Sequence, residues 1–591
     1  MSFFSPPSRA ACVAVVGCLL WAASAWAAVD EAVTAAERRR VETIRRASAA
    51  AVAIFAGESG GGSGVLVSPD GYALSNFHVT QPAGLAMQCG LDDGKLYDAV
   101  LVGLDPTGDV ALVKLLGRED FPCVPLTDSD LVEPGDFCFA AGNPFLLATD
   151  LRPSISAGIV SGVHRYQFPA GTILEYADCI QVDAAINPGN SGGGLFDAAG
   201  RLIGVNGRAS FEKRGRVNVG VGYAISANQL RNFMGLLRAG RIADHATLGA
   251  VVATSADGKV VVSDILESSD AWRRGLRHDD EIVALAGRPV RTVNAFKNVL
   301  GTLPAGWQVP LVYRRGGRRH EVLVRLAAVH APAELAAIVA GETPAAERDR
   351  KEGDGEGRPE KREPPAEPPA ERSAAARRDA LPVAVRGLVD PRPGFANHHF
   401  NVVERDRVAK ALAAGGRDAP NAWVFTGTLD TGGEFRIELT DDAATIDLPT
   451  GRSTIDPRAD LDARPEPPGS GGLLAAFVVW RRLVREGPAA TGRTTYWGTA
   501  PADPGTLGEF ATPALVDVLE SAVAGVETRL FVDGGGRVVG IDLWTAPDAD
   551  PCEVRFAGGA GGLPATIEVR RGTVPFARFR VAADAATGGA R

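Results

Sequence analysis

The stretch that decides the fold is DAAINPGNSGGGL, residues 183–195. A nucleophilic serine needs an exposed hydroxyl on a tight turn, with backbone N–H groups aimed at the oxygen that becomes negative during acyl transfer. Gly189 and Ser191 would supply those N–H groups as an oxyanion hole. Gly192 and Gly193 would let a substrate backbone approach. The alternative interpretation is a glycine-rich surface turn without chemistry.

A serine hydroxyl is a poor nucleophile unless a base removes its proton, and histidine suits that work near neutral pH. Two histidines precede Ser191: His78, within LSNFHVT, and His164. A lone histidine among small and apolar neighbours is more often a packed core residue. The base also needs a buried carboxylate. Asp109 opens an alternating strand and suits that role, whereas Asp105 lies in a Pro-Thr-Gly turn and is more simply a turn residue.

The predicted order along the chain is histidine, aspartate, serine. This order is that of the chymotrypsin-type double β-barrel and differs from those of subtilisin and the α/β hydrolases. Short strands recur between AVAIF and VGVGYAIS, which favours a closed or sandwiched all-β domain. A helix is predicted to follow, because Ser226 and Gln229 form a capping-box pair ahead of an apolar face over residues 230–237.

Six motifs in this region resemble the HtrA (Deg) family of ATP-independent serine proteases of the cell envelope. They are SNFHVT, GDVALVK, AAGNPF, SISAGIVSG, QVDAAINPGNSGGGL and VGVGYAIS, and the resemblance spans about residues 45–330. It implies a chymotrypsin-like double β-barrel protease domain over residues 28–244. The charged stretch AAERRRVETIRRA predicts a short helix at residues 31–48, at the N-terminal end of this domain. The resemblance also implies a catalytic set of His78, Asp109 and Ser191, with the N–H groups of Gly189 and Ser191 as the oxyanion hole.

By the same resemblance, Ala184, Ala185 and Ile186 line the primary specificity pocket. No acidic residue stands there to receive lysine or arginine. We therefore expect cleavage after small or medium apolar side chains. Such side chains are mostly buried in folded proteins, so the expected substrates are unfolded or damaged proteins. The alternative function is a chaperone or binding protein in which proteolysis is secondary.

Residues 245–330 resemble the PDZ domain that this family carries. PDZ domains add a peptide as an extra strand and hold its terminal carboxylate with loop N–H groups. Here Leu248, Gly249 and Ala250 occupy that loop, so peptide C-termini are implied partners. Asp279 replaces a glycine that is usual in the family's hairpin. The alternative is that this segment merely covers the protease. Family members commonly form trimers, so the resemblance also implies a homo-oligomer.

The remaining chain is predicted from composition. Residues 331–384 are charged, rich in proline and poor in large apolar side chains, which is typical of an extended disordered linker. Residues 385–591 form a separate α+β domain with no catalytic constellation, and its late strands resemble half-barrel lipoprotein-carrier folds such as LolA. His398 and His399 would face opposite sides of a strand, so they should not share a metal.

Residues 1–27 read as a signal peptide, with an apolar stretch that closes on Ala-Trp-Ala. The protein is therefore expected to be exported to the periplasm or cell envelope. Two alternatives are an uncleaved anchor helix and lipidation at Cys18. The net charge of −9 gives nucleic acid no electrostatic reason to bind. No metal or other cofactor is expected. Five cysteines follow the signal, and Cys552 is interpreted as a buried thiol, whereas four could pair in an oxidising compartment: Cys89, Cys123, Cys138 and Cys179.

Overall fold

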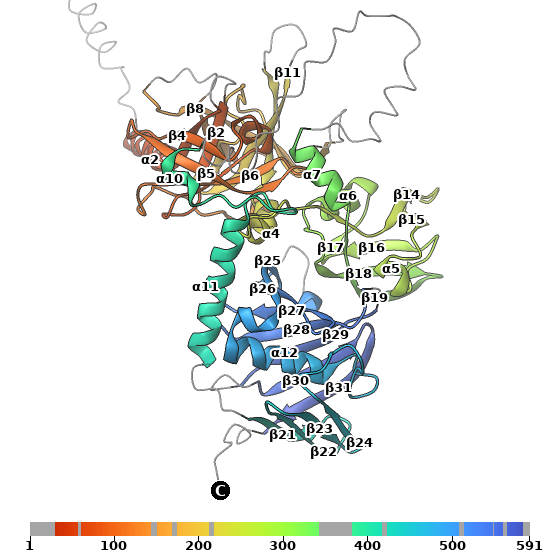
Figure 1. The fold of residues 1–591 in the computed structure, drawn as a ribbon. Coiled ribbons are helices and arrows are strands. Elements are labelled where there is room, and N and C mark those ends of the chain that lie inside the picture. Colours follow the sequence, from red (N-terminus) through yellow and green to blue (C-terminus); the bar gives the residue numbers. More distant parts are fainter. Residues whose placement is uncertain are drawn as a thin grey trace, which may run out of the picture.

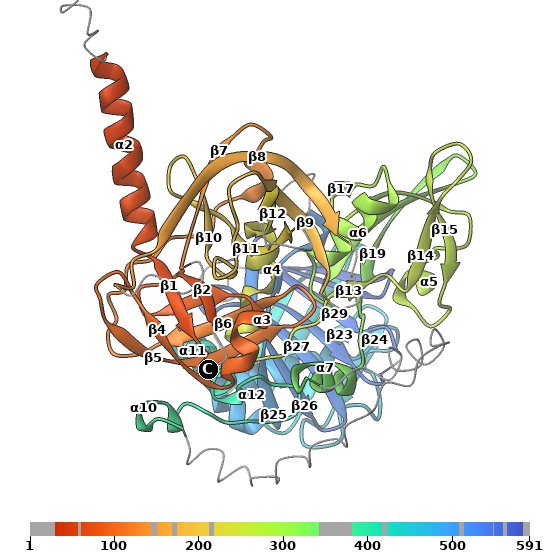
Figure 2. The same cartoon turned by 90° about the horizontal axis from the view of Figure 1, so that it is seen from above.

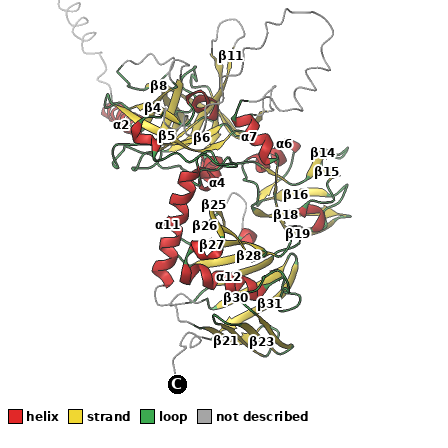
Figure 3. Cartoon of the chain, in the orientation of Figure 1, coloured by secondary structure: helices red, strands yellow, loops and turns green. Residues whose placement is uncertain are grey.

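The protein is mainly β and contains three units that follow one another along the chain (Figures 1 and 3). The structure is a computed structural model. It describes residues 30–56, 61–143, 150–167, 174–211, 218–341, 381–416, 422–506, 513–547, 549–559 and 564–582. The predicted signal peptide lies outside these residues, and so does most of the predicted linker. Among the described residues no helix is both long and apolar enough to cross a membrane.

Two closed six-stranded barrels form the first unit, which confirms the predicted chymotrypsin-like double barrel. The first barrel has the strand order β1-β2-β3-β6-β5-β4 and the second has the order β10-β11-β12-β9-β8-β7. Most strand positions of the first barrel are buried, as expected when a sheet closes around its own side chains. The strands of the first barrel are β1 (Ala51–Phe55), β2 (Gly61–Leu66), β3 (Tyr72–Ser75), β4 (Ala86–Gly90), β5 (Leu96–Asp105) and β6 (Val110–Leu115). Those of the second are β7 (Phe137–Gly142), β8 (Ser154–Gln167), β9 (Tyr176–Val182), β10 (Gly194–Asp197), β11 (Leu202–Phe211) and β12 (Asn218–Ser226).

Helices flank the barrels where the sequence predicts them. Helix α2 (Glu31–Ser48) projects from the first barrel with nearly all of its residues at least partly exposed (Figure 2). Helix α4 (Ala227–Arg238) begins at Ser226, whose hydroxyl accepts the predicted hydrogen bond from the N–H of Gln229. The buried face of α4 packs against the ends of β5 and β11. Shorter helical turns are α3 (Phe77–Thr80), η2 (Gln81–Ala83) and η3 (Ser129–Leu131).

The second unit, here called the small sheet unit (residues 246–328), is an antiparallel sheet with two short helices. Its strand order is β14-β15-β16-β18-β19, which leaves β14 at a free edge. Asp279 has φ of 64°, a left-handed conformation that glycine adopts most readily. Aspartate tolerates this backbone conformation better than most residues, so it can stand where a glycine is expected. The elements are β13 (Ala246–Thr247), β14 (Ala250–Thr254), β15 (Val260–Ile265), α5 (Asp270–Arg273), β16 (Glu281–Leu285), β17 (Arg288–Pro289), α6 (Val293–Gly301), β18 (Gln308–Arg315), β19 (Arg318–Arg325) and β20 (Ala327–Ala328).

The third unit, here called the C-terminal unit (described residues 381–582), is an 11-stranded antiparallel sheet wrapped around helix α12 (Leu473–Glu486). Helix α12 contacts strands from both halves of the sheet, β22 to β24 and β27 to β29, so the sheet must curl around it. The predicted strands curling around a helix are thus observed. The strands are β21 (Trp423–Leu429), β22 (Glu434–Leu439), β23 (Ala444–Leu448), β24 (Gly451–Ile455), β25 (Arg493–Pro501), β26 (Leu515–Val523), β27 (Val526–Val532), β28 (Val538–Trp544), β29 (Cys552–Ala557), β30 (Thr566–Arg571) and β31 (Val574–Val581), and the short helical turns are η5 (Pro488–Thr491) and η6 (Pro504–Thr506).

The hollow of this sheet is filled by its own side chains. Aromatic rings from α12, β21 and β29 pack against one another with centroids between 4.6 and 6.4 Å apart. A half-barrel that carries a lipid needs open apolar space, whereas here Phe477 and Trp480 of α12 occupy it. The aromatic side chains therefore form the core of this unit.

Helices form at two places where the sequence predicts a linker and a strand, so both predictions are wrong there. Residues 332–339, assigned to the linker, form helix α7 (Pro332–Val339), because Leu335 and Ile338 give that segment a buried apolar face. His398 and His399 begin helix α11 (His398–Gly416) instead of lying on a strand, and His398 Nδ1 lies 2.9 Å from Asp390 Oδ2. A short helix, α10 (Val383–Arg386), comes before it.

The C-terminal unit is bound to both other units. Asn401 of α11 donates to the carbonyl oxygens of Ala239 (3.0 Å) and Tyr496 (2.7 Å), which joins α4 to β25. The indole of Trp307, in the small sheet unit, donates to the carbonyl of Thr499 at 2.9 Å. Figure 1 shows α11 running from the barrels down to the large sheet. The three units therefore form one body with buried polar contacts between them.

All five described cysteines are free, so the pairing that an oxidising compartment would allow is not formed between them. Cys552 is buried, as predicted, and burial raises the pKa of its thiol.

Candidate functional site

The fold brings His78 and Asp109 together at the rim of the first barrel. His78 Nδ1 lies 2.8 Å from Asp109 Oδ2, and the backbone N–H of His78 donates to Asp109 Oδ1 at 3.0 Å. The Asp109 side chain is fully buried, whereas 43% of the His78 side chain is exposed. Burial lowers the pKa of His78, but the hydrogen bond and charge of Asp109 raise it by more, so it lies above its ordinary value. This arrangement orients the imidazole and leaves Nε2 for a reacting group.

Asp109 is held by neighbours that sequence reasoning missed. Its carboxylate also accepts a short hydrogen bond from the hydroxyl of Tyr176, a buried residue at the start of β9. Its backbone carbonyl accepts from the N–H of Phe77 (3.2 Å) and from Asn76 Nδ2 (2.9 Å). Asp109 has φ of 58°, a left-handed conformation that aspartate tolerates better than most residues and that these hydrogen bonds help to hold. A tyrosine far along the chain gives no local signal of such a contact.

Ser191 lies on the predicted turn, at the junction of the two barrels. Its hydroxyl donates to the carbonyl oxygen of Gly207 at 3.2 Å. A serine hydroxyl has a single proton, so His78 cannot accept it while this bond exists. The arrangement is therefore a resting one, because the Ser191 hydroxyl must redirect its proton to His78 before His78 can act as its base. The ring of Tyr176 borders the same place, because a Cβ at Gly207 would lie 2.4 Å from its Cε1 atom.

The N–H groups of Gly189 and Ser191 have no acceptor among the described residues, so both remain available to a ligand. The loop is fixed by Ser63 of β2, which sequence reasoning also missed. The Ser63 hydroxyl donates to the carbonyl of Gly189 at 2.6 Å, and its N–H donates to the carbonyl of Ser191 at 2.9 Å. Gly189 itself has φ of 100°, which a residue with a side chain would adopt only with strain.

The prediction for Gly192 and Gly193 needs correction. Both residues are buried: Gly192 lets the turn approach β2 of the first barrel, and Gly193 lets it approach β7 of the second. A Cβ at Gly192 would lie 2.1 Å from the carbonyl oxygen of Ser63, and one at Gly193 would lie 2.3 Å from that of Ala141. The glycine run is thus required by packing at the barrel interface as well as by the turn.

Two of the three predicted pocket residues point away from solvent. Ala184 and Ile186 are 1% and 2% exposed and belong to the core of the second barrel, whereas Ala185 is exposed. The carbonyl of Ala185 accepts from Ser156 Oγ at 2.8 Å. The predicted preference for apolar side chains therefore rests on Ala185 among these residues.

In the small sheet unit, the loop of Leu248, Gly249 and Ala250 comes directly before the free edge of β14. Gly249 has φ of 70°, and its N–H donates to Thr247 Oγ1 at 3.1 Å. Leu248 is buried. Val251, on the open edge strand, is 61% exposed. The edge therefore has room for an added strand, while one of the loop N–H groups already has an internal acceptor.

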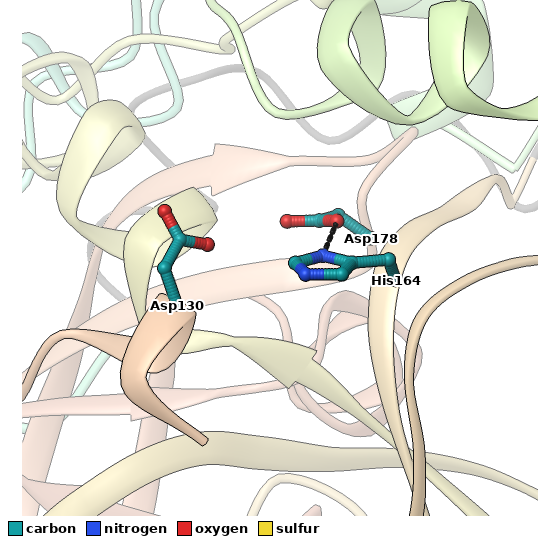
Figure 4. Close-up of side chains that lie close together, drawn as sticks. All are labelled: Asp130, His164 and Asp178. Carbon is teal, nitrogen blue, oxygen red and sulfur yellow. Dashed lines mark hydrogen bonds and ion pairs between the residues drawn. The ribbon is translucent and has the colours of Figure 1, made fainter. Parts of the chain in front are cut away.

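The second histidine before Ser191, His164, belongs to another cluster. His164 Nδ1 lies 2.7 Å from Asp178 Oδ1, and Asp130 lies close to both (Figure 4). These three side chains have spacings that could hold a metal ion. The guanidinium of Arg288, from the small sheet unit, already binds both carboxylates, at 2.6 Å from Asp130 and 3.1 Å from Asp178. The cluster is therefore an ion-pair contact between the second barrel and the small sheet unit, in which the Arg288 guanidinium is the cation.

Comparison with known proteins places the double barrel in a family. Residues 62–205 match the family described as trypsin-like peptidase domain. The periplasmic serine endoprotease DegP of Escherichia coli K12 is 34% identical over 277 residues, which cover 45% of this chain and 56% of DegP. A probable periplasmic serine endoprotease DegP-like of Chlamydia trachomatis serovar D is 34% identical over 275 residues, covering 44% and 53%.

The match thus spans little more than half of the length of these relatives. Among solved structures, an HtrA-type protease AlgW with tripeptide aligns with 50% of this chain and 98% of its own, at 31% identity and a TM-score of 0.42. The matched residues 62–205 include His78, Asp109 and Ser191 in that order. Through this domain, the chain belongs to the HtrA/Deg family of trypsin-like serine proteases.

Proposed function

We propose that the protein is an ATP-independent serine endopeptidase in which His78, Asp109 and Ser191 form the catalytic triad. The observation that carries this proposal is the pairing of a partly exposed imidazole with a fully buried carboxylate beside a serine turn with two available N–H groups. His78 would take the Ser191 proton during attack, and the imidazolium would be stabilised by Asp109. The N–H groups of Gly189 and Ser191 would bind the oxyanion of the acyl-transfer intermediate.

The proposed substrates are unfolded or damaged proteins, cleaved after small or medium apolar residues. The small sheet unit would act as a PDZ domain that binds peptide C-termini along the edge of β14, where Val251 is exposed. Export to the periplasm or cell envelope is supported by the sequence of residues 1–27 and by the periplasmic relatives. An anchor at the membrane, through an uncleaved helix or a lipid at Cys18, is the alternative. Assembly into a homo-oligomer stays a prediction.

A second candidate function is favoured by one contact. The Ser191 hydroxyl donates to Gly207 instead of His78, as expected of a binding protein or chaperone that keeps the fold without turnover. A protease in a resting state has the same arrangement, and a bound peptide would release it by favouring the active conformer. The two functions differ in whether any condition makes Ser191 reactive.

A fluorophosphonate probe separates the two functions, because it reacts with an activated serine without needing a cognate substrate. The full chain is incubated with the probe, with and without an added peptide that ends in an apolar residue, and the adduct is located by mass spectrometry. Labelling of Ser191, lost in Ser191→Ala and accompanied by casein digestion, supports the endopeptidase. An unlabelled Ser191 under both conditions, with the barrels folded, refutes it and leaves the binding protein.

A further inference from the structure

A buried histidine–aspartate pair lies next to the turn that leads into Asp109. It joins Asp105, the last residue of β5, to His245 in the connector, which we define as residues 239–245 between α4 and β13. His245 Nε2 lies 3.0 and 2.9 Å from the two carboxylate oxygens of Asp105, and both side chains are at most 2% exposed. A carboxylate so buried needs a donor or an opposite charge. Asp105 is thus more than the simple turn residue that the sequence suggests.

Asp105 fixes the peptide next to Asp109. Its Oδ1 atom accepts a hydrogen bond of 2.8 Å from the N–H of Gly108. A Cβ at Gly108 would lie 2.3 Å from Asp105 Oδ2 and 2.7 Å from His245 Nε2, so the pair packs directly on this backbone. The following residue, Asp109, has φ of 58°, the left-handed conformation that closes this turn. The hydrogen bond from Gly108 to Asp105 fixes the peptide that leads into it.

The connector is bound to the barrel on one side and to the small sheet unit on the other. Leu104 of β5 accepts from the N–H of Ala243 (2.7 Å) and donates to the carbonyl of Arg241 (3.0 Å). The carbonyl of His245 accepts from the N–H of Val329, at the end of the small sheet unit, at 3.2 Å. His245 is therefore bound to both parts, so a shift of the small sheet unit relative to the barrels would displace it.

The other groups around His245 would not replace its role. The ring of Phe233, from α4, packs on the imidazole at a tilt of 34°, with centroids 4.5 Å apart. Asp244 accepts from the N–H of His245 at 2.9 Å, but its carboxylate pairs with His330. The remaining charged neighbour is Glu175, whose own N–H binds the carbonyl of Thr107 in the same turn. Gln229 Nε2 of α4 also lies beside Gly108, 2.8 Å from where its Cβ would be. Among the described residues of the connector, the imidazole of His245 is the side-chain donor that reaches Asp105.

We propose that His245 is a positioning residue for the peptidase: through Asp105 it holds the turn that presents Asp109 to His78. Because His245 belongs to the connector, the small sheet unit has a direct route to the triad aspartate, without contact with Ser191 or with the substrate. This inference rests on the proposed peptidase function.

The test compares two substitutions of the full chain with a matched control. His245→Leu removes the donor, and His245→Gln retains an N–H that can reach the position of Nε2. His398→Leu is the control, since it removes another histidine–aspartate pair, with Asp390, outside the turn of residues 105–109. For each variant the second-order rate of fluorophosphonate labelling of Ser191 is measured from pH 5 to 9 and divided by the folded fraction from circular dichroism.

The expected result is a labelling rate roughly ten- to a hundredfold lower in His245→Leu, as for a misplaced catalytic group. Asp109 holds the pKa of His78 above its ordinary value, so loosening it should move the acid limb of the pH profile to lower pH. His245→Gln should restore both the rate and the limb, and His398→Leu should change neither. A merely structural role would lower the folded fraction and leave the limb in place.

The inference is overturned if His245→Leu labels at the wild-type rate per folded molecule, or if its acid limb does not move. If His245→Leu does not fold, His245→Asn takes its place, because the shorter amide cannot reach Asp105. A wild-type labelling rate per folded molecule or an unmoved acid limb in His245→Asn then overturns the inference. A wild type that is not labelled at Ser191 overturns the proposed function and this inference with it. A labelled wild type with an equally labelled His245→Leu overturns the inference alone.

Discussion

Replacing Tyr176 with phenylalanine removes one hydroxyl and leaves the ring that borders Gly207. The fully buried Asp109 carboxylate then keeps only the two donors of His78. A hydrogen bond to a charged group contributes about 1.5–3 kcal/mol, so the barrels should lose about that much stability. For a unit of roughly 200 residues this corresponds to a fall of about 3–12 °C in Tm.

The same substitution should also affect the pH profile. The Tyr176 hydroxyl competes with His78 for the Asp109 charge, so its loss strengthens the pair and raises the pKa of His78 further. The acid limb of fluorophosphonate labelling should therefore move to higher pH, the opposite of the shift expected for His245→Leu. Tyr97→Phe is the control, since that hydroxyl binds Asp93 at an exposed site. If Tyr176→Phe leaves both Tm and the acid limb of the labelling profile unchanged, the Tyr176 hydroxyl neither stabilises Asp109 nor competes with His78 for its charge.

Three further outcomes are expected. Gly192→Ala places a methyl group 2.1 Å from the Ser63 carbonyl at φ of 85°, so labelling of Ser191 should fall at least tenfold and Tm should drop; a wild-type rate would contradict the packing role. The hydrogen bond to Asp178 raises the pKa of His164, so that pair stabilises fully below about pH 6.5 and its contribution is lost as pH rises through the folded-state pKa. His164→Asn should therefore lower the free energy of unfolding more at pH 5.5 than at pH 8.5, and an equal loss at both would contradict this. Asn401→Ala removes the acceptor of the Tyr496 N–H and leaves the Tyr496 carbonyl with the longer bonds from Arg241 (3.3 Å), so urea unfolding should show a loss of about 1–3 kcal/mol.

The sequence predicts the double barrel because its signals are local. Alternating apolar strands, the capping serine of α4 and the glycine-rich turn at Ser191 each leave a pattern within a few residues. The chain order of His78, Asp109 and Ser191 then selects the chymotrypsin-type fold. What the sequence could not show depends on residues that are distant along the chain. Tyr176 on Asp109, Ser63 on Gly189, and the partners of buried Asp105 in the connector follow only from the closure of the barrels.

Composition also misled where tertiary contacts override it. Residues 332–339 follow directly on the strands and have a helical apolar face, although they were assigned to a polar linker. The two histidines at 398 and 399 begin a helix because the residues that follow them dock mainly on β25 and α12. Tertiary packing, more than propensity, decides such segments.

The most direct test of the central claim is a crystal structure of the full chain after phosphonylation by the fluorophosphonate. We predict phosphorus on Ser191 Oγ, with the hydrogen bond from Ser191 to the Gly207 carbonyl broken. The phosphonyl oxygen should lie within hydrogen-bond reach of the N–H groups of Gly189 and Ser191. We also predict His78 Nε2 within about 2.6–3.2 Å of a phosphonate or Ser191 oxygen. Phosphorus on another residue, or an imidazole beyond hydrogen-bond reach of the adduct, would contradict these predictions.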